Sequence, residues 1–200
     1  MKDIDFNKDY ILENKVILLR PLISDDIKNL SEFSINEPNL WKYSLTPADG
    51  LENLNNYVHL ALEGRRNKTS YPFIVYDKRT NQYAGCTRFY DFQKQHQTTQ
   101  LGYTWYGKDF QASGLNKNCK FLLLQFAFEE LGLERVEFRA DANNKQSIAA
   151  MKSIGCKEEG ILRLNCSSPS GRRNSIVLSI LKTEWFQEVK QQLSKKIITN

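Results

Sequence analysis

The chain has 200 residues and a formal net charge of +5, a length that suits one well-cored domain spanning residues 1–200. Its content of 40% hydrophobic, 12% aromatic and 26% charged residues excludes an intrinsically disordered chain. It has no apolar run of the ~18 residues that a membrane span needs. The N-terminus lacks the apolar segment of a secretory signal, so we expect a cytoplasmic protein with no membrane contact.

The basic residues and the cysteines do not indicate a nucleic-acid or metal site. Lys and Arg are spread along the chain, so we interpret the positive charge as a solvated surface. The aromatic residues fall mainly at core spacing, which disfavours direct binding of nucleic acid. The cysteines lack the CxxC spacing of metal and redox motifs, and we expect reduced core thiols at Cys86, Cys119, Cys156 and Cys166.

The first half of the chain predicts two helices between strands. Ser24, Asp25 and Asp26 follow a strand-like segment that ends in proline, and such residues commonly cap a helix. In chain order we expect a strand over residues 15–22, a helix from this cap to about residue 34, a second helix over residues 51–63 with apolar residues at helical spacing, and a β-hairpin of residues 72–77 and 83–92.

A third strand is predicted over residues 99–106, and it contains a glycine. Because side chains alternate along a strand, Leu101, Tyr103 and Trp105 should share one face. Gly102 weakens a strand, so it indicates a bulge or a place where another group approaches the backbone. Simple packing room is an equally good explanation of this glycine.

The second half predicts a β-α-β crossover and a final hairpin. A broad apolar stripe indicates a largely buried helix over residues 116–131. It is followed by a strand over 135–140, a short helix with an Asn cap within 141–155, a hairpin, and a polar C-terminal helix. Helices before, between and after antiparallel strands predict the α+β class, with a mixed, mostly antiparallel twisted sheet of about six to seven strands.

The loop before the buried helix, residues 111–116, has the features of an anion site. A helix start exposes backbone N–H groups and the positive end of the helix dipole, and a preceding Gly114 lets the chain wrap an anion closely. A single glycine before a helix is common in ordinary turns, so this feature is a weak signal by itself.

The chain resembles the Gcn5-related N-acetyltransferase (GNAT) family in several motifs that follow one another in the family's order. These are LRPL near the start, Gln-x-x-Gly-x-Asn after a strand that contains LGYTW, the segment LGLERVEFRADANNKQSIAAMKSIGCKEEGILR, and SILKTEW near the end, which together cover residues 15–186. Within the family, the ribosomal-protein α-amino (RimJ/RimL-type) acetyltransferases are the most similar branch.

This resemblance implies the acetyltransferase fold, with acetyl-CoA as co-substrate and no metal. Two splayed neighbouring strands, here residues 99–106 and 135–140, would hold acetyl-CoA between them. The residues it assigns to the cofactor are the loop backbone at Gln111, Ala112, Ser113, Gly114, Leu115 and Asn116, the strand backbone at Tyr103, Thr104 and Trp105, and the side chains of Lys117 and Asn144, with Lys120 as a further cation. Asn116 stands where the family often has Gly or Ala, which leaves the amide cradle intact.

The chemical groups depart from the family in two places. Amide formation from an amine and a thioester needs a proton acceptor for the amine and a proton for the departing thiolate. The family's usual acid is a Tyr at the position of Met151, and Ser147, which matches a serine of the Rim-type enzymes, is our first candidate instead. Gln100 stands where a Glu base is often found.

Two residues before the third strand are candidate replacements for the missing base. They are Asp91 and His96, of which His96 has the more suitable ordinary pKa. An exposed loop histidine without a role is the plainer explanation of His96. The base matters less for an α-amine, because its pKa of ~8 leaves a useful neutral fraction at neutral pH, whereas a lysine at ~10.4 does not.

The expected function is therefore direct acetyl transfer to a primary amine, most consistent with the N-terminus of a protein such as a ribosomal protein. A small amine acceptor, such as a polyamine, an aminoglycoside or an amino-acid derivative, is an alternative within the same fold. A non-catalytic acyl-CoA-binding or interaction module is a second alternative, because Gln100 and Met151 replace two chemical groups. The C-terminal segment and the last hairpin could support a homodimer.

Overall fold

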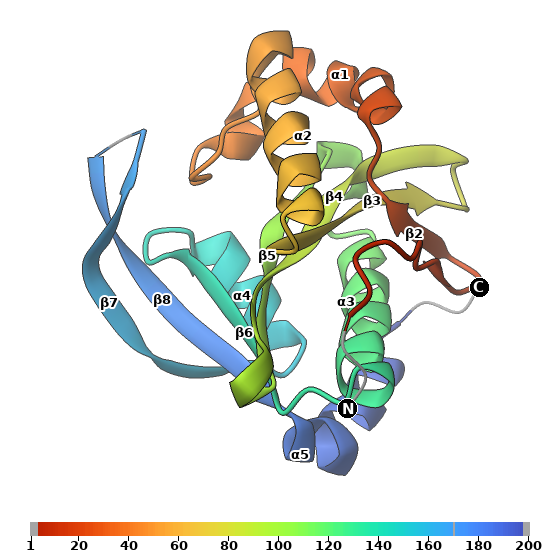
Figure 1. The fold of residues 1–200 in the computed structure, drawn as a ribbon, viewed down its shortest axis with the longest axis vertical. Coiled ribbons are helices and arrows are strands. Elements are labelled where there is room, and N and C mark those ends of the chain that lie inside the picture. Colours follow the sequence, from red (N-terminus) through yellow and green to blue (C-terminus); the bar gives the residue numbers. More distant parts are fainter. Residues whose placement is uncertain (1–3, 170, 198–200) are drawn as a thin grey trace.

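The computed structural model describes residues 4–169 and 171–197, and these residues contain one eight-stranded sheet (Figure 1). The strand order is β1-β2-β3-β4-β5-β6-β8-β7, and every neighbouring pair is antiparallel except β5 and β6. The strands are β1 (Leu12–Glu13), β2 (Ile17–Pro21), β3 (Ser70–Asp77), β4 (Gln82–Gln93), β5 (Thr98–Tyr106), β6 (Arg135–Asp141), β7 (Lys157–Ser168) and β8 (Gly171–Leu181).

The α+β class and the mixed sheet are confirmed, whereas the expected strand number is too low. The additional strand is β1, which has only two residues and pairs with β2 through Leu12 and Glu13. Two residues are too few to show an alternating pattern, so sequence periodicity cannot detect such a strand.

Helices cover both faces of the sheet. They are α1 (Ile27–Asn36), α2 (Gly50–Arg66), α3 (Leu115–Gln125), α4 (Lys145–Ser153), α5 (Lys182–Glu184) and α6 (Lys190–Ser194). A π-helical turn, Phe126–Glu130, prolongs α3, and a second one, Trp185–Val189, joins α5 to α6. None of the helices in the described ranges is long and apolar enough to cross a membrane.

Two hydrophobic clusters, one on each face, hold the helices on the sheet. In the first, α3 packs through Leu123 and Leu124 against sheet residues such as Phe89. In the second, α1 and α2 pack through Leu30 and Leu54 against another set of sheet residues. We call the face of the sheet that carries the first cluster the α3 face, and the face that carries the second cluster the α2 face.

A bulge in β5 changes which face its side chains reach. Tyr103 has a φ of 50°, and the pairing with β4 shifts register between Cys86 and Arg88. As a result Leu101 belongs to the core of the α3 face and Trp105 to the core of the α2 face. The expectation that these two share a face is wrong, because an inserted residue reverses the alternation beyond it.

The bulge lies next to the glycine that pointed to it. Gly102 pairs with Arg88, immediately before Tyr103. A Cβ atom on Gly102 would also lie only 3.1 Å from the ring of Tyr90. Both explanations of this glycine therefore hold: the strand bulges here, and an aromatic ring crosses its backbone closely.

Three local expectations need correction. Ser24, Asp25 and Asp26 form a short 3-10 turn that leads into α1. The Asp26 carboxylate accepts from the Ile23 N–H at the start of this turn and from Arg20 at 2.6 and 2.8 Å, so the cap lies one turn before α1. Cys86, Cys119 and Cys156 are buried free thiols as expected, but Cys166 is only half-buried on the last hairpin. The C-terminal helical segment is amphipathic, since Trp185 is fully buried.

Candidate active site

The parallel strands β5 and β6 separate after a short paired stretch. Their pairing covers only Thr98 with Arg135, Thr99 with Val136, and Gln100 with Glu137. Beyond this point β5 continues along β4 as far as Tyr106, while β6 continues along β8 as far as Asp141. The backbone edges that face each other across the gap are therefore unpaired over the second half of β5. This is the splayed strand pair that the family resemblance implies.

The loop of residues 111–116 lies between the end of β5 and the start of α3. Gly114 is left-handed, with φ 83° and ψ −11°, and Ala112 is also left-handed, with φ 56°. Five backbone N–H groups here donate no hydrogen bond to any described residue; they belong to Ala112, Ser113, Gly114, Asn116 and Lys117. Free N–H groups at a helix start with a left-handed turn form an anion-binding concavity.

Neighbouring side chains hold this loop in place. The amide of Gln111 donates to the Tyr106 carbonyl at 3.0 Å and accepts from Gln146 of α4 at 3.0 Å. Ser113 Oγ donates to the Phe110 carbonyl at 2.7 Å. Asn118, which is fully buried, donates to the Gly114 carbonyl at 3.2 Å. The loop is therefore ordered by contacts that leave the N–H groups of Ala112, Ser113, Gly114 and Asn116 unused.

The other predicted cofactor residues lie either at the start of α3 or on β5. Asn116 and Lys117 are half-exposed at the start of α3. Leu115 is fully buried, so only its backbone can face a ligand. On β5, the Tyr103 carbonyl accepts a hydrogen bond from the Tyr57 hydroxyl at 3.2 Å.

Helix α4 begins beside the gap with the predicted Asn cap. The side-chain oxygen of Asn144 accepts from the Ser147 backbone N–H at 3.0 Å. Ser147 Oγ is half-exposed and makes no hydrogen bond to a described residue. Met151 lies one turn further on, 7% exposed, within the core of the α3 face. Of this helical face, Ser147 is the residue with a transferable proton.

Lys120 points from α3 into the gap. It is only 5% exposed, and its Nζ lies 2.8 Å from Thr104 Oγ1, 3.4 Å from Thr87 Oγ1 and 5.9 Å from the centre of the Phe138 ring. Burial away from water lowers the pKa of Lys120 to about 8. The family resemblance gave Lys120 as a further cation for the cofactor, near the loop. Instead, the lysine joins β5 and β6 from the α3 face.

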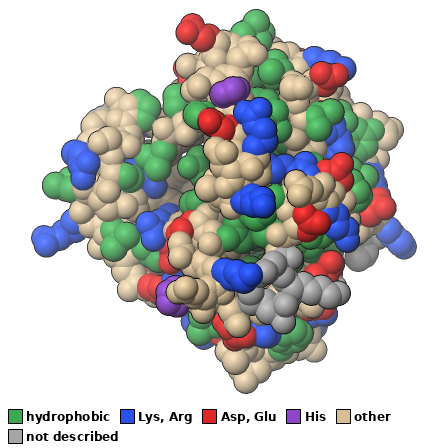
Figure 2. Space-filling view, in the orientation of Figure 1, with side chains coloured by type: hydrophobic (Ala, Val, Ile, Leu, Met, Phe, Trp, Pro, Cys, Tyr) green, Lys and Arg blue, Asp and Glu red, His purple; other side chains and the backbone are tan. Residues whose placement is uncertain are grey.

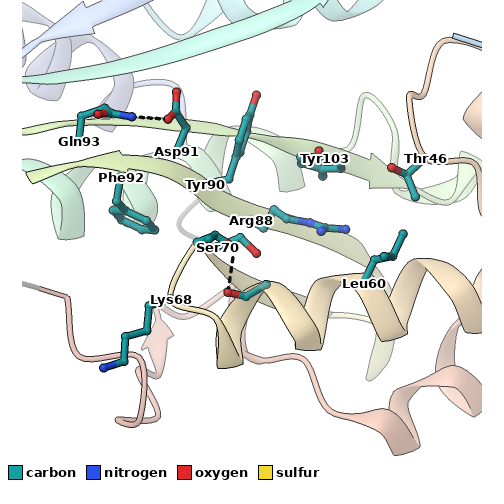
Figure 3. A pocket seen from close by; sticks show the side chains of 12 residues that line it. Thr46, Leu60, Lys68, Ser70, Arg88, Tyr90, Asp91, Phe92, Gln93 and Tyr103 are labelled. Atoms are coloured by element: carbon teal, nitrogen blue, oxygen red, sulfur yellow. Dashed lines mark hydrogen bonds between the residues drawn. The ribbon is translucent and has the colours of Figure 1, made fainter. Parts of the chain in front are cut away.

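A pocket opens on the other face of the sheet, between α2 and β4 (Figure 3). Its volume is about 560 Å³, within the usual range for ligand sites. The side chains that matter below are Leu60, Lys68, Arg88, Tyr90, Asp91 and Tyr103. We call it the α2 pocket. Arg88, Tyr103 and Leu60 lie toward one end, and Asp91 and Gln93 toward the other (Figure 3).

The two candidate bases lie in different places. Asp91, which lines the α2 pocket, accepts from Gln100 Nε2 at 2.7 Å and from Gln93 Nε2 at 2.6 Å. A carboxylate therefore lies next to Gln100, the residue that replaces the expected Glu. His96 is exposed on the short 3-10 turn before β5 and is not among the residues that line the pocket. The structure thus brings Asp91, and not His96, to the pocket.

Sequence reasoning missed Arg88, a buried residue of this pocket. It lies in a hairpin strand with no motif around it, and only its pairing with Gly102 places it beside the bulge. The face of the molecule in Figure 2 shows basic and acidic side chains interspersed rather than gathered into one patch. The described residues contain no group of three or more His, Cys, Asp or Glu side chains that could hold a metal ion.

Comparisons with known proteins point to one family. The acetyltransferase (GNAT) domain family matches residues 17–157. YdaF of Bacillus subtilis (strain 168), provisionally named a ribosomal N-acetyltransferase, is 27% identical in an alignment 181 residues long that covers 88% of this chain and 96% of YdaF. The uncharacterized N-acetyltransferase p20 of Bacillus licheniformis is 25% identical in an alignment 179 residues long that covers 84% of this chain and 94% of p20.

Solved structures share the fold. A GCN5-related N-acetyltransferase from Brucella melitensis has a TM-score of 0.86 at 21% identity, covering 94% of this chain and 85% of its own. The ribosomal-protein-S5-alanine acetyltransferase from Vibrio fischeri has a TM-score of 0.71 at 16% identity, covering 88% of this chain and 99% of its own. At these identities the likeness concerns the fold.

Proposed function

Because this chain belongs to the acetyltransferase (GNAT) domain family, we propose that it transfers the acetyl group of acetyl-CoA directly to a primary amine. The observation that carries the proposal is the loop of residues 111–116. Its unused N–H groups and left-handed Gly114 lie at the start of α3, next to the gap between β5 and β6. A phosphate-bearing ligand would fit the loop, and an extended chain would fit the gap.

The residues present suit acetyl-CoA. The loop N–H groups would hold its pyrophosphate, and the unpaired edge of β5 near Thr104 would bond the pantetheine arm. When bound, acetyl-CoA supplies an acetyl group already activated as a thioester. The protein therefore needs mainly to orient the amine and to move two protons.

The two proton transfers can be assigned to Asp91, which is bonded to Gln100 of β5, and to Ser147 on α4, the helix that follows β6. In the overall reaction the amine nitrogen bonds to the acetyl carbon, the carbon–sulfur bond breaks, the amine loses a proton and the thiolate gains one. Asp91, held by Gln100 at 2.7 Å, would take the amine proton directly or through water. Ser147 Oγ, which is half-exposed at the start of α4, would give the proton to the thiolate.

A peptide N-terminus is the acceptor that we favour. The name of YdaF and the resemblance to the RimJ/RimL-type branch support an N-terminal α-amine of a ribosomal protein. An α-amine with a pKa of ~8 also makes a modest demand on the base. Small amines such as polyamines remain the alternative acceptors, since the α2 pocket is large enough for them.

Thermal unfolding with and without acetyl-CoA tests the first step. A ligand that binds only the folded state stabilises it by about 2.7 kcal/mol at a hundred times its Kd, so we expect a clear rise in Tm. Mass spectrometry of N-terminal peptides and of small amines after incubation then identifies the acceptor class. A folded protein whose Tm is unchanged by acetyl-CoA would contradict the proposal. Binding without acetylation of any amine would favour a non-catalytic interaction module.

A further inference from the structure

Arg88 is buried at the inner end of the α2 pocket without an ionic partner. Its side chain is 5% exposed, and its Nη2 atom is buried with no hydrogen-bond partner. No carboxylate of a described residue lies within ion-pair distance of it. A guanidinium stays charged at all ordinary pH values, so burial without an anion is unfavourable.

Five other arginines each have a carboxylate within 2.8 Å: the pairs are Arg20 with Asp26, Arg65 with Asp9, Arg79 with Asp77, Arg135 with Glu137, and Arg139 with Glu137. Arg66, Arg163 and Arg172 have no ion pair with a described residue but are exposed to water, and the half-buried Arg173 donates to Ser175 Oγ and to the Tyr43 carbonyl. All of these arginines are more exposed than Arg88. The most buried arginine of the described residues is thus also one that lacks an acidic partner, which indicates that the partner comes from outside the chain.

Two tyrosine rings hold the guanidinium in place. Its Cζ atom lies 4.0 Å from the centre of the Tyr103 ring and 4.8 Å from the centre of the Tyr57 ring. The Tyr57 hydroxyl is already bonded to the Tyr103 carbonyl. Contacts through ring faces fix a guanidinium but do not use its N–H donors, which lie in its own plane and match a carboxylate.

The position of Arg88 relates it to the acceptor rather than to the cofactor loop. It pairs with Gly102 at the bulge, on the α2 face, and it lines the same pocket as Asp91. Three residues along a strand span about 10 Å. An acceptor that places an amine near Asp91 and an anionic group near Arg88 would therefore bridge the two ends of the pocket (Figure 3).

We infer that the α2 pocket selects an acceptor amine that also carries a carboxylate, and that Arg88 binds this carboxylate. This inference rests on the proposed acetyl transfer. The span of the pocket suits a peptide whose first or second residue is Asp or Glu. A free amino acid offers the same chemical group from a smaller molecule, and acetylation of free aspartate or glutamate with a kcat/KM above that of the acidic peptides would identify it as the source.

The experiment compares acceptors that differ only in charge. Peptides with Asp or Glu at position one or two are paired with peptides that carry Asn or Gln there, and free aspartate and glutamate form a further arm. Acetylation is followed by mass spectrometry to give kcat/KM. We expect the wild type to favour acidic over amide peptides by at least ~10-fold, the ratio for a hydrogen bond to a charged group. Arg88→Gln should bring this ratio close to one.

A matched control is Lys68→Gln, which removes one positive charge from the exposed mouth of the same pocket. It should keep most of the preference for acidic peptides. The acetyl-CoA-induced rise in Tm, measured for every variant, shows that the protein is folded. If Arg88→Gln does not fold, Arg88→Lys, which keeps the charge but loses the planar fork, takes its place and should lower the ratio.

The outcomes separate this inference from the proposed function. Equal use of acidic and amide peptides by the wild type, or an equal loss of both in Arg88→Gln, would overturn the role of Arg88. If acetyl-CoA binds but no acceptor is acetylated, the proposed function fails. Calorimetric binding of the same peptides to the CoA-loaded protein then tests whether Arg88 binds their carboxylate. At least ~10-fold tighter binding of acidic peptides, lost in Arg88→Gln, would support the inference. Equal affinities would overturn it.

Discussion

A buried cation lies on each face of β5, and the two cations have different partners. Lys120 on the α3 face and Arg88 on the α2 face are both 5% exposed. Lys120 bonds to the hydroxyl of Thr104 at 2.8 Å and has a pKa lowered to about 8 by burial. Arg88 is held by tyrosine rings and keeps its charge.

This difference indicates which kind of ligand, neutral or anionic, each face can bind. A lysine can release its proton, so its burial needs no anion and suits a gap that a neutral pantetheine chain would occupy. An arginine cannot, so its burial is relieved by an anion in the pocket. We therefore expect variants on the α3 face to change acetyl-CoA binding, turnover or pH dependence. Variants on the α2 face should change the choice of acceptor.

The largest expected effect is on the loop of the α3 face. Gly114→Trp should abolish the acetyl-CoA-induced rise in Tm, because a large side chain at a residue with φ 83° fills the concavity formed by the N–H groups. Gly114→Ala, which carries the same backbone strain but little bulk, should keep part of the rise. Normal binding of acetyl-CoA by Gly114→Trp, or loss of this binding in Arg88→Gln, would contradict the assignment of the cofactor to the α3 face.

The second effect concerns proton transfer at α4. Ser147→Ala should keep the acetyl-CoA-induced rise in Tm and lower kcat by about 100-fold or more, the usual contribution of a positioned acid. Its preference for acidic over amide peptides should stay that of the wild type, because Ser147 does not line the α2 pocket. Steady-state kinetics with one acidic peptide measures this. Unchanged turnover would remove Ser147 as the acid.

The third effect is on stability and sharpens the difference between the two cations. The pKa of Lys120 is about 8 in the folded protein and 10.5 ordinarily. The unfolded chain therefore binds more protons between these values, and the stability due to this group rises with pH across that window. Below pH ~8 the cost of the buried charge is fully present. Lys120→Met should thus raise the Tm at pH 7 by about 5 °C, and less at pH 9 to 10.

Differential scanning calorimetry of the ligand-free protein at several pH values measures this gain. Lys117→Met is the matched control, since Lys117 is half-exposed on the same helix and should shift the Tm little at any pH. If the rise in Tm for Lys120→Met were the same at every pH, burial would not disfavour the charged form of this lysine.

The smallest expected effect is on the cap of α4. Asn144→Ala removes the bond to the Ser147 N–H and should lower stability by about 1 kcal/mol, or ~3 °C in Tm. Asn143→Ala, at an exposed neighbouring residue, should be close to neutral. A larger fall in acetyl-CoA affinity than in stability would show that Asn144 also contacts the cofactor.

Local patterns in the sequence predicted much of this protein. Helical and alternating periodicity predicted the order of the elements, and Gly102 indicated the bulge in β5. The loop at Gly114 and the cap at Asn144 were also predictable, because each depends on residues within a few positions of each other. The family resemblance added the splay of β5 and β6, which the pairing confirms.

The tertiary structure alone decided which side chains meet. The bulge at Tyr103 sent Trp105 to the face opposite Leu101, and pairing across the sheet brought Asp91 to Gln100. Burial of Lys120 likewise depends on packing between distant segments. The sequence by itself thus determined the elements and the left-handed loop before α3, where the causes are local. Only the fold determined the two buried cations and their different surroundings, because these depend on strand register and on packing over long distances in the chain.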